Sequence, residues 1–126
     1  MPAVVSFIDC INRGDLDGLG RLMADDHTLR VLDEKPLVGR SANVEAWNGY
    51  FESFPHYVIH PHVFVDGIMG VAVLGHTTGS HLGLPDAEEA RITVIWHSHV
   101  AGGFLRTWSV IDDTPTARAE YGLPPA

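Results

Sequence analysis

One stretch decides the fold of this chain: Gly75-His76-Thr77-Thr78-Gly79-Ser80-His81-Leu82-Gly83-Leu84-Pro85. It lies in the half of the sequence where the spacing of apolar residues changes from a helical period to a period of two. That change predicts four strands, at residues 57–66, 68–81, 88–100 and 104–112. The turns between them are predicted at Asp66-Gly67, Pro85-Asp86 and Gly102-Gly103.

Helices are predicted before these strands. Pro2 suits the first turn of a helix, and Gly14 is expected to end that helix. Asp15 is a candidate N-cap for a second helix, and Ser41 is one for a third helix that Pro55 ends.

The remaining elements complete an α+β plan. Residues 27–33 are predicted to form a first strand, and residues 114–126, with three prolines and a glycine, an irregular tail. Helices followed by a run of antiparallel strands are typical of an α+β domain. No repeat or linker divides the chain, so residues 1–126 are predicted to form one domain.

The strand at 88–100 carries apolar residues on both faces. Ile95 and His97 lie on one face, and Trp96 lies on the other. Apolar residues on both faces indicate that both faces are covered. The helices can cover one face, and the other needs a partner, most simply a second copy. We therefore expect a homodimer through the face that carries Trp96, Arg106 and Trp108.

Composition excludes several classes of function. The net charge is -8 with only eight Lys and Arg residues, which argues against nucleic acid and against an anionic membrane surface. No apolar run approaches the roughly 20 residues that a membrane span needs, and the N-terminus lacks the pattern of a signal peptide. Cys10 is the single cysteine, so no internal disulfide forms, and a cytoplasmic setting is expected.

The stretch at 75–85 resembles the G-T-H-T-G-E-F-L-G-L-P segment of SnoaL-like polyketide cyclases, a branch of the nuclear transport factor 2-like superfamily. Other segments resemble the same family in the same order, namely residues 7–15, 22–26, 38–40, 54–55 and 102–108. The resemblance implies an α+β cone, in which a curved antiparallel sheet wraps around N-terminal helices and encloses an apolar pocket. Members of this superfamily include cyclases, ketosteroid isomerases and epoxide hydrolases, and also proteins that bind a ligand without catalysis.

Several positions depart from the family pattern. Ile95 stands where cyclases and isomerases carry an acidic aspartate, and Phe7 stands where isomerases carry a tyrosine. The loss of both donors argues against ketosteroid isomerase activity. Asp33 matches the family's general-base position. His76 is displaced by one residue from the cyclase histidine, and such a displacement changes the face of a strand.

Two candidate catalytic residues follow. His97 lies two residues beyond Ile95 and is expected on the same, pocket-facing side, where it can act as a general base. The alternative is a buried neutral histidine that bonds Thr107 or Ser109. Asp33 is the second candidate base if it points into a dry pocket. Its alternative role is to begin a turn.

The third helix is expected to form the pocket roof, with Trp47 as wall and Tyr50 as a polar contact for a ligand. The full set of expected ligand contacts is Phe7, Trp47, Tyr50, Phe51, His76, Ile95, Thr107, Ser109 and Ile111.

Two H-x-H pairs, His60-Pro61-His62 and His97-Ser98-His99, each place two imidazoles on one side of a strand. Neither pair has a third ligand at a standard spacing, so we predict no metal and no cofactor. Two functions remain. One is an acid–base enzyme of cyclase, isomerase or hydrolase type that acts on a small apolar molecule with a carbonyl group. The other is a protein that binds such a molecule without turnover.

Overall fold

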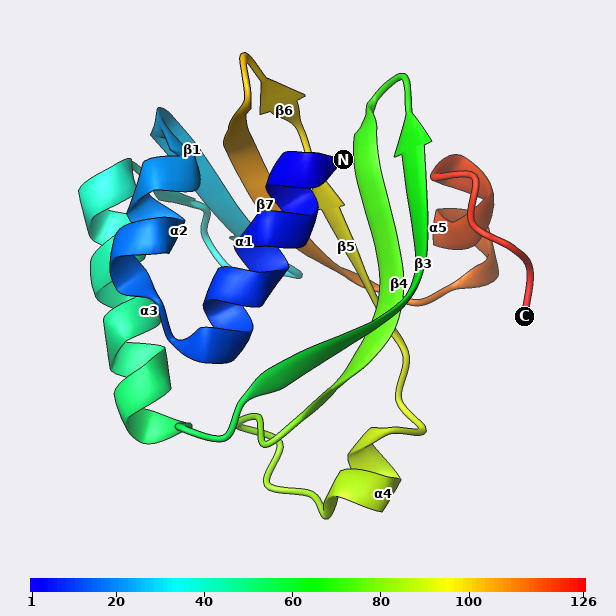
Figure 1. Ribbon diagram of the computed structural model, residues 1–126. Coiled ribbons are helices and arrows are strands. Elements are labelled where there is room, and N and C mark those ends of the chain that lie inside the picture. The colour runs from blue at the N-terminus through cyan, green and yellow to red at the C-terminus, as the bar shows by residue number, and fades with distance from the viewer.

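The computed structural model describes all 126 residues of the sequence, and its fold is α+β (Figure 1). Three helices cover one side of a curved sheet. They are α1 (Pro2–Arg13), α2 (Leu16–Leu22) and α3 (Arg40–Ser53). Two further helices are short, α4 (Asp86–Glu89) and α5 (Pro115–Glu120). The strands are β1 (Met23–Val31), β2 (Leu37–Val38), β3 (Val58–Gly67), β4 (Gly70–Thr78), β5 (Val94–Ser98), β6 (Val100–Ala101) and β7 (Phe104–Asp112).

Local sequence signals explain the first two helices. Pro2 occupies the first turn of α1, where its missing N–H costs no hydrogen bond. Gly14 ends α1 in the left-handed conformation, at φ 65°. The Asp15 side chain then accepts a hydrogen bond from the Gly18 N–H at 2.9 Å and caps α2. These three predictions are confirmed.

The sheet is mixed. Its strand order is β2-β1-β7-β5-β4-β3, and β6 pairs with β7 outside this path. Strands β3, β4, β5 and β7 pair antiparallel in that order, as expected. The expectation of a wholly antiparallel sheet is wrong at one place, because β1 runs parallel to β7. These two strands are the first and last long strands of the chain, so no hairpin links them and their relative direction is free.

A buried amide fixes α3 on the sheet. Asn43 is fully buried, and its Nδ2 donates to the carbonyl oxygens of His27, Leu37 and Gly39 at 3.1, 3.0 and 2.8 Å. One side chain therefore ties the first turn of α3 to β1 and to the segment around β2. This connection sets the position of Trp47, one turn further along α3.

Two segments differ from the sequence-based expectation. Residues 88–100 were expected to form one strand, but they contain the end of α4 and the shorter β5. Acidic residues in the first turn favour that helix, because they complement its positive N-terminal dipole. Residues 114–126 were expected to be irregular, but α5 forms there. The Thr114 hydroxyl oxygen accepts from the Ala117 N–H at 3.0 Å, and Pro115 takes the first helical position.

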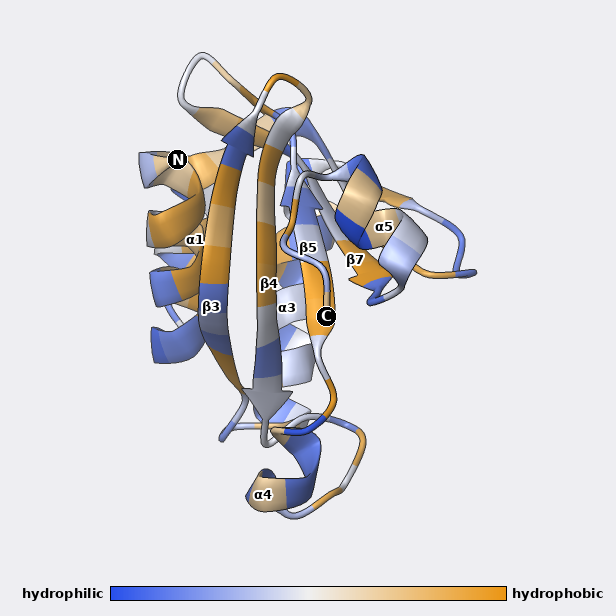
Figure 2. Ribbon diagram, turned by 90° about the vertical axis from the view of Figure 1, so that its right-hand side faces the viewer, coloured by the Kyte–Doolittle hydropathy of each residue, from blue (hydrophilic) through white to orange (hydrophobic).

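The two faces of the sheet bury different residues. On the helix side, the main core includes Phe7, Trp96 and Trp108, and the Phe7 and Trp108 rings lie 5.0 Å apart. On the other side, α5 covers a smaller cluster made of Ala72, Leu74, Ile95, Ala117 and Leu123. Figures 1 and 2 show α5 on the face of the sheet opposite to α1 and α3.

The predicted assignment of the faces of β5 is therefore wrong. Even-numbered residues such as Trp96 face the helices, and odd-numbered residues such as Ile95 face α5. Trp96 and Trp108 are each 1% exposed within a single chain, so they cannot form a dimer interface. Large aromatic rings bury more apolar area than Ile95 and His97 do, and the deeper core takes them. Association of two copies through the remaining outer surface stays a prediction, which sedimentation velocity at micromolar concentration tests.

His27 is buried within β1 and is neutral. Its side chain is fully buried, and Nδ1 lies 2.8 Å from the carbonyl oxygen of Leu105. Because a carbonyl can only accept, Nδ1 carries the proton and donates it. Nε2 is left buried without a partner. Burial lowers the pKa of His27, and the hydrogen bond to Leu105 only partly opposes that effect.

The free energy of unfolding is expected to fall as the pH decreases from about 7.5 to about 5.5. The folded state binds the His27 proton more weakly than the unfolded state does, so the unfolded state carries more protons in this range. The stabilisation is complete above the unfolded pKa of about 6.5 and is lost as the pH falls below it. Urea unfolding at several pH values measures the slope of the unfolding free energy against pH. Burial also lowers the pKa of His76 and His97, so His27→Gln should reduce the slope without removing it. An unchanged slope in this variant would contradict the assignment.

No helix of the structure is long and apolar enough to span a membrane.

Candidate functional site

A cavity of about 570 Å³ lies between α3 and the concave face of the sheet. This volume is within the usual range of small-molecule sites. Fourteen of its twenty lining residues are hydrophobic, which favours an apolar ligand. Trp47 from α3, Trp96 from β5 and Trp108 from β7 all contribute to its wall, and they are the only three tryptophans of the chain. None of the lining residues is Lys or Arg, so the cavity offers no counter-charge to an anion.

A tyrosine–histidine pair lies at the mouth of this cavity. The hydroxyl of Tyr50, from α3, is 2.9 Å from Nδ1 of His81, which follows β4. The backbone N–H of His81 also donates to the Tyr50 hydroxyl oxygen, at 3.3 Å. Both residues line the cavity, Tyr50 half-buried and His81 exposed. Two contacts between the same residues hold the imidazole close to the phenol.

The pair offers a donor and an acceptor to a ligand. With the imidazole proton on Nδ1, the ring donates to the Tyr50 oxygen, the phenol proton is free to bond a ligand, and Nε2 carries a lone pair. With the proton on Nε2, the phenol donates to Nδ1 instead. Burial raises the pKa of Tyr50, so the phenol keeps its proton at neutral pH and remains a donor.

Further aromatic and hydroxyl groups surround the pair. Tyr57 packs edge-on against Tyr50, with ring centroids 4.9 Å apart, and burial raises its pKa. Thr77 and Ser80, at the end of β4 and just beyond it, also line the cavity. The indole Nε1 of Trp47 is buried without a hydrogen-bond partner. Three of the six non-hydrophobic lining residues, Thr77, Ser80 and His81, thus lie at the end of β4 or just beyond it.

The mouth of the cavity is itself largely apolar. Leu32, Leu82 and Ile92 line it, and they are 57%, 49% and 45% exposed. Leu32 adopts a positive φ of 41°, which is rare for a residue with a branched side chain. Glu34 and Asp112 add two exposed carboxylates. The apolar wall therefore continues to the surface, and its only formal charges are negative.

His97 does not border this cavity, and the prediction that it does is wrong. Its ring packs against Tyr121, with centroids 4.6 Å apart, on the face covered by the C-terminal segment. Ile95 lies on that same face, in the cluster under α5. The error has one cause, the wrong assignment of the faces of β5, which moves every odd-numbered residue away from the cavity.

Three other expected contacts also lie on the outer face. Ser109 pairs with His97 across β5 and β7, and the Thr107 hydroxyl accepts a hydrogen bond from the His99 N–H at 2.9 Å. Neither lines the cavity. His76 is outside as well, whereas its neighbour Thr77 is in the wall. The one-residue displacement of this histidine thus places it on the surface.

The remaining expected site residues lie in the cavity wall, in the core or in a turn. Trp47, Tyr50 and Ile111 line the cavity. Phe7 is fully buried in the core, and Phe51 packs behind Trp47 with ring centroids 5.5 Å apart, so the structure places neither of them in the wall. Asp33 lies in the exposed turn after β1, and its neighbour Glu34 reaches the cavity instead.

The two H-x-H pairs do not meet. His60 and His62 gather around His76, with the His60 and His76 rings stacked at 4.5 Å and His62 Nε2 2.7 Å from His76 Nδ1. His97 pairs with Ala72, four residues away from His76 along β4. No group of three or more His, Cys, Asp or Glu residues is arranged to hold a metal ion.

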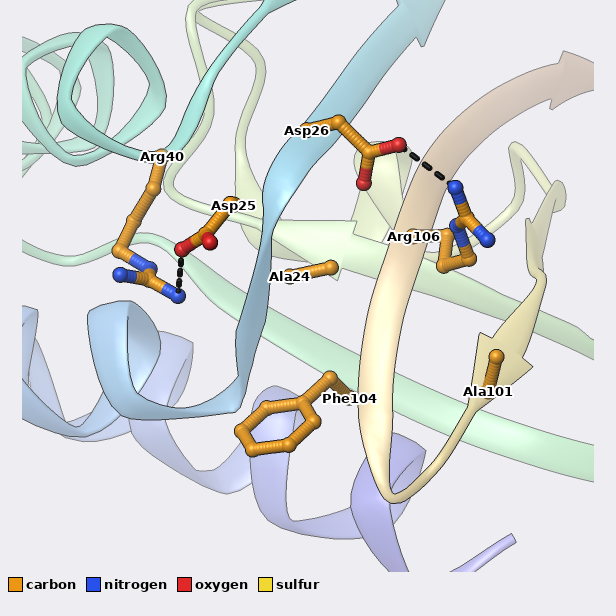
Figure 3. A pocket seen from close by; sticks show the side chains of 7 residues that line it. All are labelled: Ala24, Asp25, Asp26, Arg40, Ala101, Phe104 and Arg106. Atoms are coloured by element: carbon orange, nitrogen blue, oxygen red, sulfur yellow. Dashed lines mark hydrogen bonds and ion pairs between the residues drawn. The ribbon is translucent and has the colours of Figure 1, made fainter.

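A second hollow, of about 330 Å³, lies beside β1 and the β6–β7 hairpin (Figure 3). Arg40 Nη2 is 2.6 Å from Asp25 Oδ1, and Arg106 Nη2 is 2.6 Å from Asp26 Oδ2. All four side chains are more than 40% exposed, and each charge already has its partner. Arg106, expected at a dimer interface, is part of this hollow. No charged side chain in this second hollow is both buried and unpaired. The larger cavity is therefore the better candidate site.

Comparison with family models identifies the family of the chain. Residues 4–108 match the model described as the SnoaL-like domain, and the chain belongs to that family. No curated protein matches the sequence.

Solved structures show the same fold. A suggested polyketide cyclase from Sinorhizobium meliloti is 17% identical, with a TM-score of 0.74, over 87% of this chain and 94% of that chain. TerC, co-crystallised with polyporic acid, is 14% identical with a TM-score of 0.71, over 95% of each chain. An epoxide hydrolase from M. tuberculosis is 13% identical with a TM-score of 0.69, over 89% of this chain and 80% of that chain. At these identities the likeness establishes the fold alone.

Proposed function

We propose that this protein catalyses acid–base chemistry on a small, neutral, mostly apolar molecule that carries a carbonyl group. The observation that carries the proposal is the Tyr50–His81 pair at the mouth of an otherwise apolar cavity. The absence of Lys and Arg from the wall favours a neutral ligand over an anion. The structural neighbour TerC was co-crystallised with polyporic acid, which supports an organic molecule as the ligand of this protein.

The two residues of the pair have complementary roles. With Nδ1 protonated, Nε2 of His81 takes a proton from the carbon next to the carbonyl group. The C–H bond breaks, an N–H bond forms, and the electron pair moves onto the carbonyl oxygen. The Tyr50 hydroxyl donates a hydrogen bond to that developing oxyanion. The proton can return at another carbon, which isomerises the substrate, or the enolate carbon can attack a second carbonyl group, which closes a ring.

Exchange of the α-protons of 2-tetralone in deuterated buffer tests this proposal without knowledge of the natural substrate. The protein is expected to accelerate this exchange, and proton NMR measures its rate. His81→Ala should reduce the protein-catalysed rate at least about 100-fold, and Tyr50→Phe should reduce it roughly 10- to 100-fold. His99→Ala, which replaces an exposed histidine outside the cavity, is the matched control and should leave the rate unchanged. Equal rates in the wild type and His81→Ala would overturn the role of His81.

Binding without turnover is the second candidate. It is favoured by the wall formed by Trp47, Trp96 and Trp108, which contains no ionisable group. Because every tryptophan of the chain lies in this wall, a ligand that enters should change the intrinsic fluorescence directly. A fluorescence change with 2-tetralone and no accelerated exchange would identify a binding protein. Accelerated exchange that depends on His81 would identify an enzyme.

A further inference from the structure

Glu89, the last residue of α4, is a buried carboxylate with no cationic partner. Its side chain is 1% exposed, and no Lys, Arg or His forms an ion pair with it. Glutamates are seldom fully buried unless they are paired, because removing a charge from water is costly. Its neighbour Glu88 is exposed on the same short helix. The burial of Glu89 therefore needs an explanation in its immediate contacts.

Those contacts hold Thr77 and Ser80, two residues that closely precede His81 in the chain. One oxygen of Glu89 accepts a hydrogen bond from the Thr77 hydroxyl, and the other accepts from the Ser80 N–H at 3.5 Å. Both partners line the cavity. Burial alone would raise the pKa of Glu89, but the hydrogen bonds from Thr77 and Ser80 outweigh it and hold the pKa below its usual range. The group is thus a carboxylate at neutral pH.

The backbone between these contacts is held closely. Gly79 has a φ of +69°, and a Cβ at this position would lie 2.3 Å from the carbonyl oxygen of His56. The next residue, Ser80, is bound by Glu89, and the one after it, His81, is bound by Tyr50 through its N–H. The backbone is thus bound at two consecutive residues, by α4 at Ser80 and by α3 at His81, and the preceding Gly79 has no room for a side chain.

We propose that Glu89 is a positioning residue for the candidate site: its carboxylate fixes the segment after β4 so that the His81 imidazole meets Tyr50. The effect of Glu89 on catalysis rests on the proposed function, whereas its effect on the position of His81 does not. A protonated His81 would in turn favour the ionised form of Glu89.

Glu89→Gln tests the proposal, with Glu88→Gln as the matched control on the same helix. The Gln variant keeps the shape but replaces one of the two carboxylate oxygens with an NH₂ group, which cannot accept the hydrogen bond that this oxygen receives from Thr77 or Ser80. We expect the NMR Overhauser contact between the Tyr50 and His81 rings to weaken. The exchange rate of bound 2-tetralone should fall at least about tenfold. Its affinity, from tryptophan fluorescence, should change less than about twofold, since the apolar wall is intact. Glu88→Gln should show none of these effects.

The outcomes separate this proposal from the proposed function. If Glu89→Gln keeps both the ring contact and the exchange rate, or if affinity falls in proportion to rate, the positioning role is wrong. If the wild type shows no exchange, the proposed function is wrong, and the ring contact alone still tests the positioning role. Should Glu89→Gln fail to fold, Thr77→Val removes one of the two donors to the carboxylate and is expected to weaken the same ring contact. An unchanged contact in that variant overturns the proposal.

Discussion

Replacement of Trp96 by alanine is expected to lower the free energy of unfolding by about 3–5 kcal/mol. Trp96 is 1% exposed, stacks on Trp108 with ring centroids 6.4 Å apart, and forms part of the cavity wall. Removal of the indole would enlarge a cavity that already exists, and the neighbouring strands are too constrained to close it. Urea denaturation followed by circular dichroism measures the loss.

The adjacent residue gives the matched control. His97 points to the opposite face of β5, is only half-buried, and packs its ring on Tyr121. His97→Ala should therefore cost only about 1 kcal/mol. A similar loss for both variants, or a larger loss for His97→Ala, would contradict the face assignment on which the whole site depends.

Replacement of Asp113 by alanine is expected to cost about 3 kcal/mol. Asp113 accepts two hydrogen bonds from Arg118 of α5, at 2.6 and 2.7 Å, and a third from the Thr93 hydroxyl. Both members of the ion pair are only 12% exposed, so loss of the carboxylate leaves a poorly solvated guanidinium. The contact of α5 with the outer face of the sheet should weaken at the same time.

A double-mutant cycle with Arg118→Met separates the pair from the packing. The double variant Asp113→Ala/Arg118→Met should be more stable than Asp113→Ala alone, because it leaves no unpaired charge. Additive losses would contradict this. The hydrogen bonds from Arg118, followed by the one from Thr93, hold the pKa of Asp113 below its usual range. Its stabilisation is therefore present above about pH 4 and lost as the pH falls further, well below the range of His27.

The missed helix α5 explains the wrong prediction of a dimer interface at the tryptophans. Residues 114–126 contain a Thr-Pro pair that is a readable start of a helix, but the following prolines and glycine hid it. Without α5, the outer face of the sheet had no cover within the chain. An uncovered outer face favours a dimer interface at the tryptophans, whereas the prediction for His97 follows from its spacing of two residues from Ile95.

Tyr50 and His81 show why the site was found only in part. Tyr50 could be identified from its position off the apolar stripe of α3. His81 lies 31 residues away, in the stretch at 75–85 that resembles the family segment. No periodicity relates two residues at such a distance, and only the packing of α3 against the end of β4 brings them together. The pattern of residues 88–100 predicts a single strand, and it gives no sign of the short helix whose last residue, Glu89, is buried.

The sequence by itself determined the family, the first three helices, the caps of α1 and α2, and the order of the long strands along the chain. Those features depend on local signals, such as Pro2, Gly14 and Asp15, and on short motifs whose order survives without any knowledge of packing. Only the tertiary structure decided which face of each strand encloses the cavity. A strand places alternate residues on opposite faces, and both faces of β5 are apolar, so its pattern carried no direction. The choice was made by α1 packing against Trp108 and by α5 covering Ile95, contacts between segments far apart in the chain.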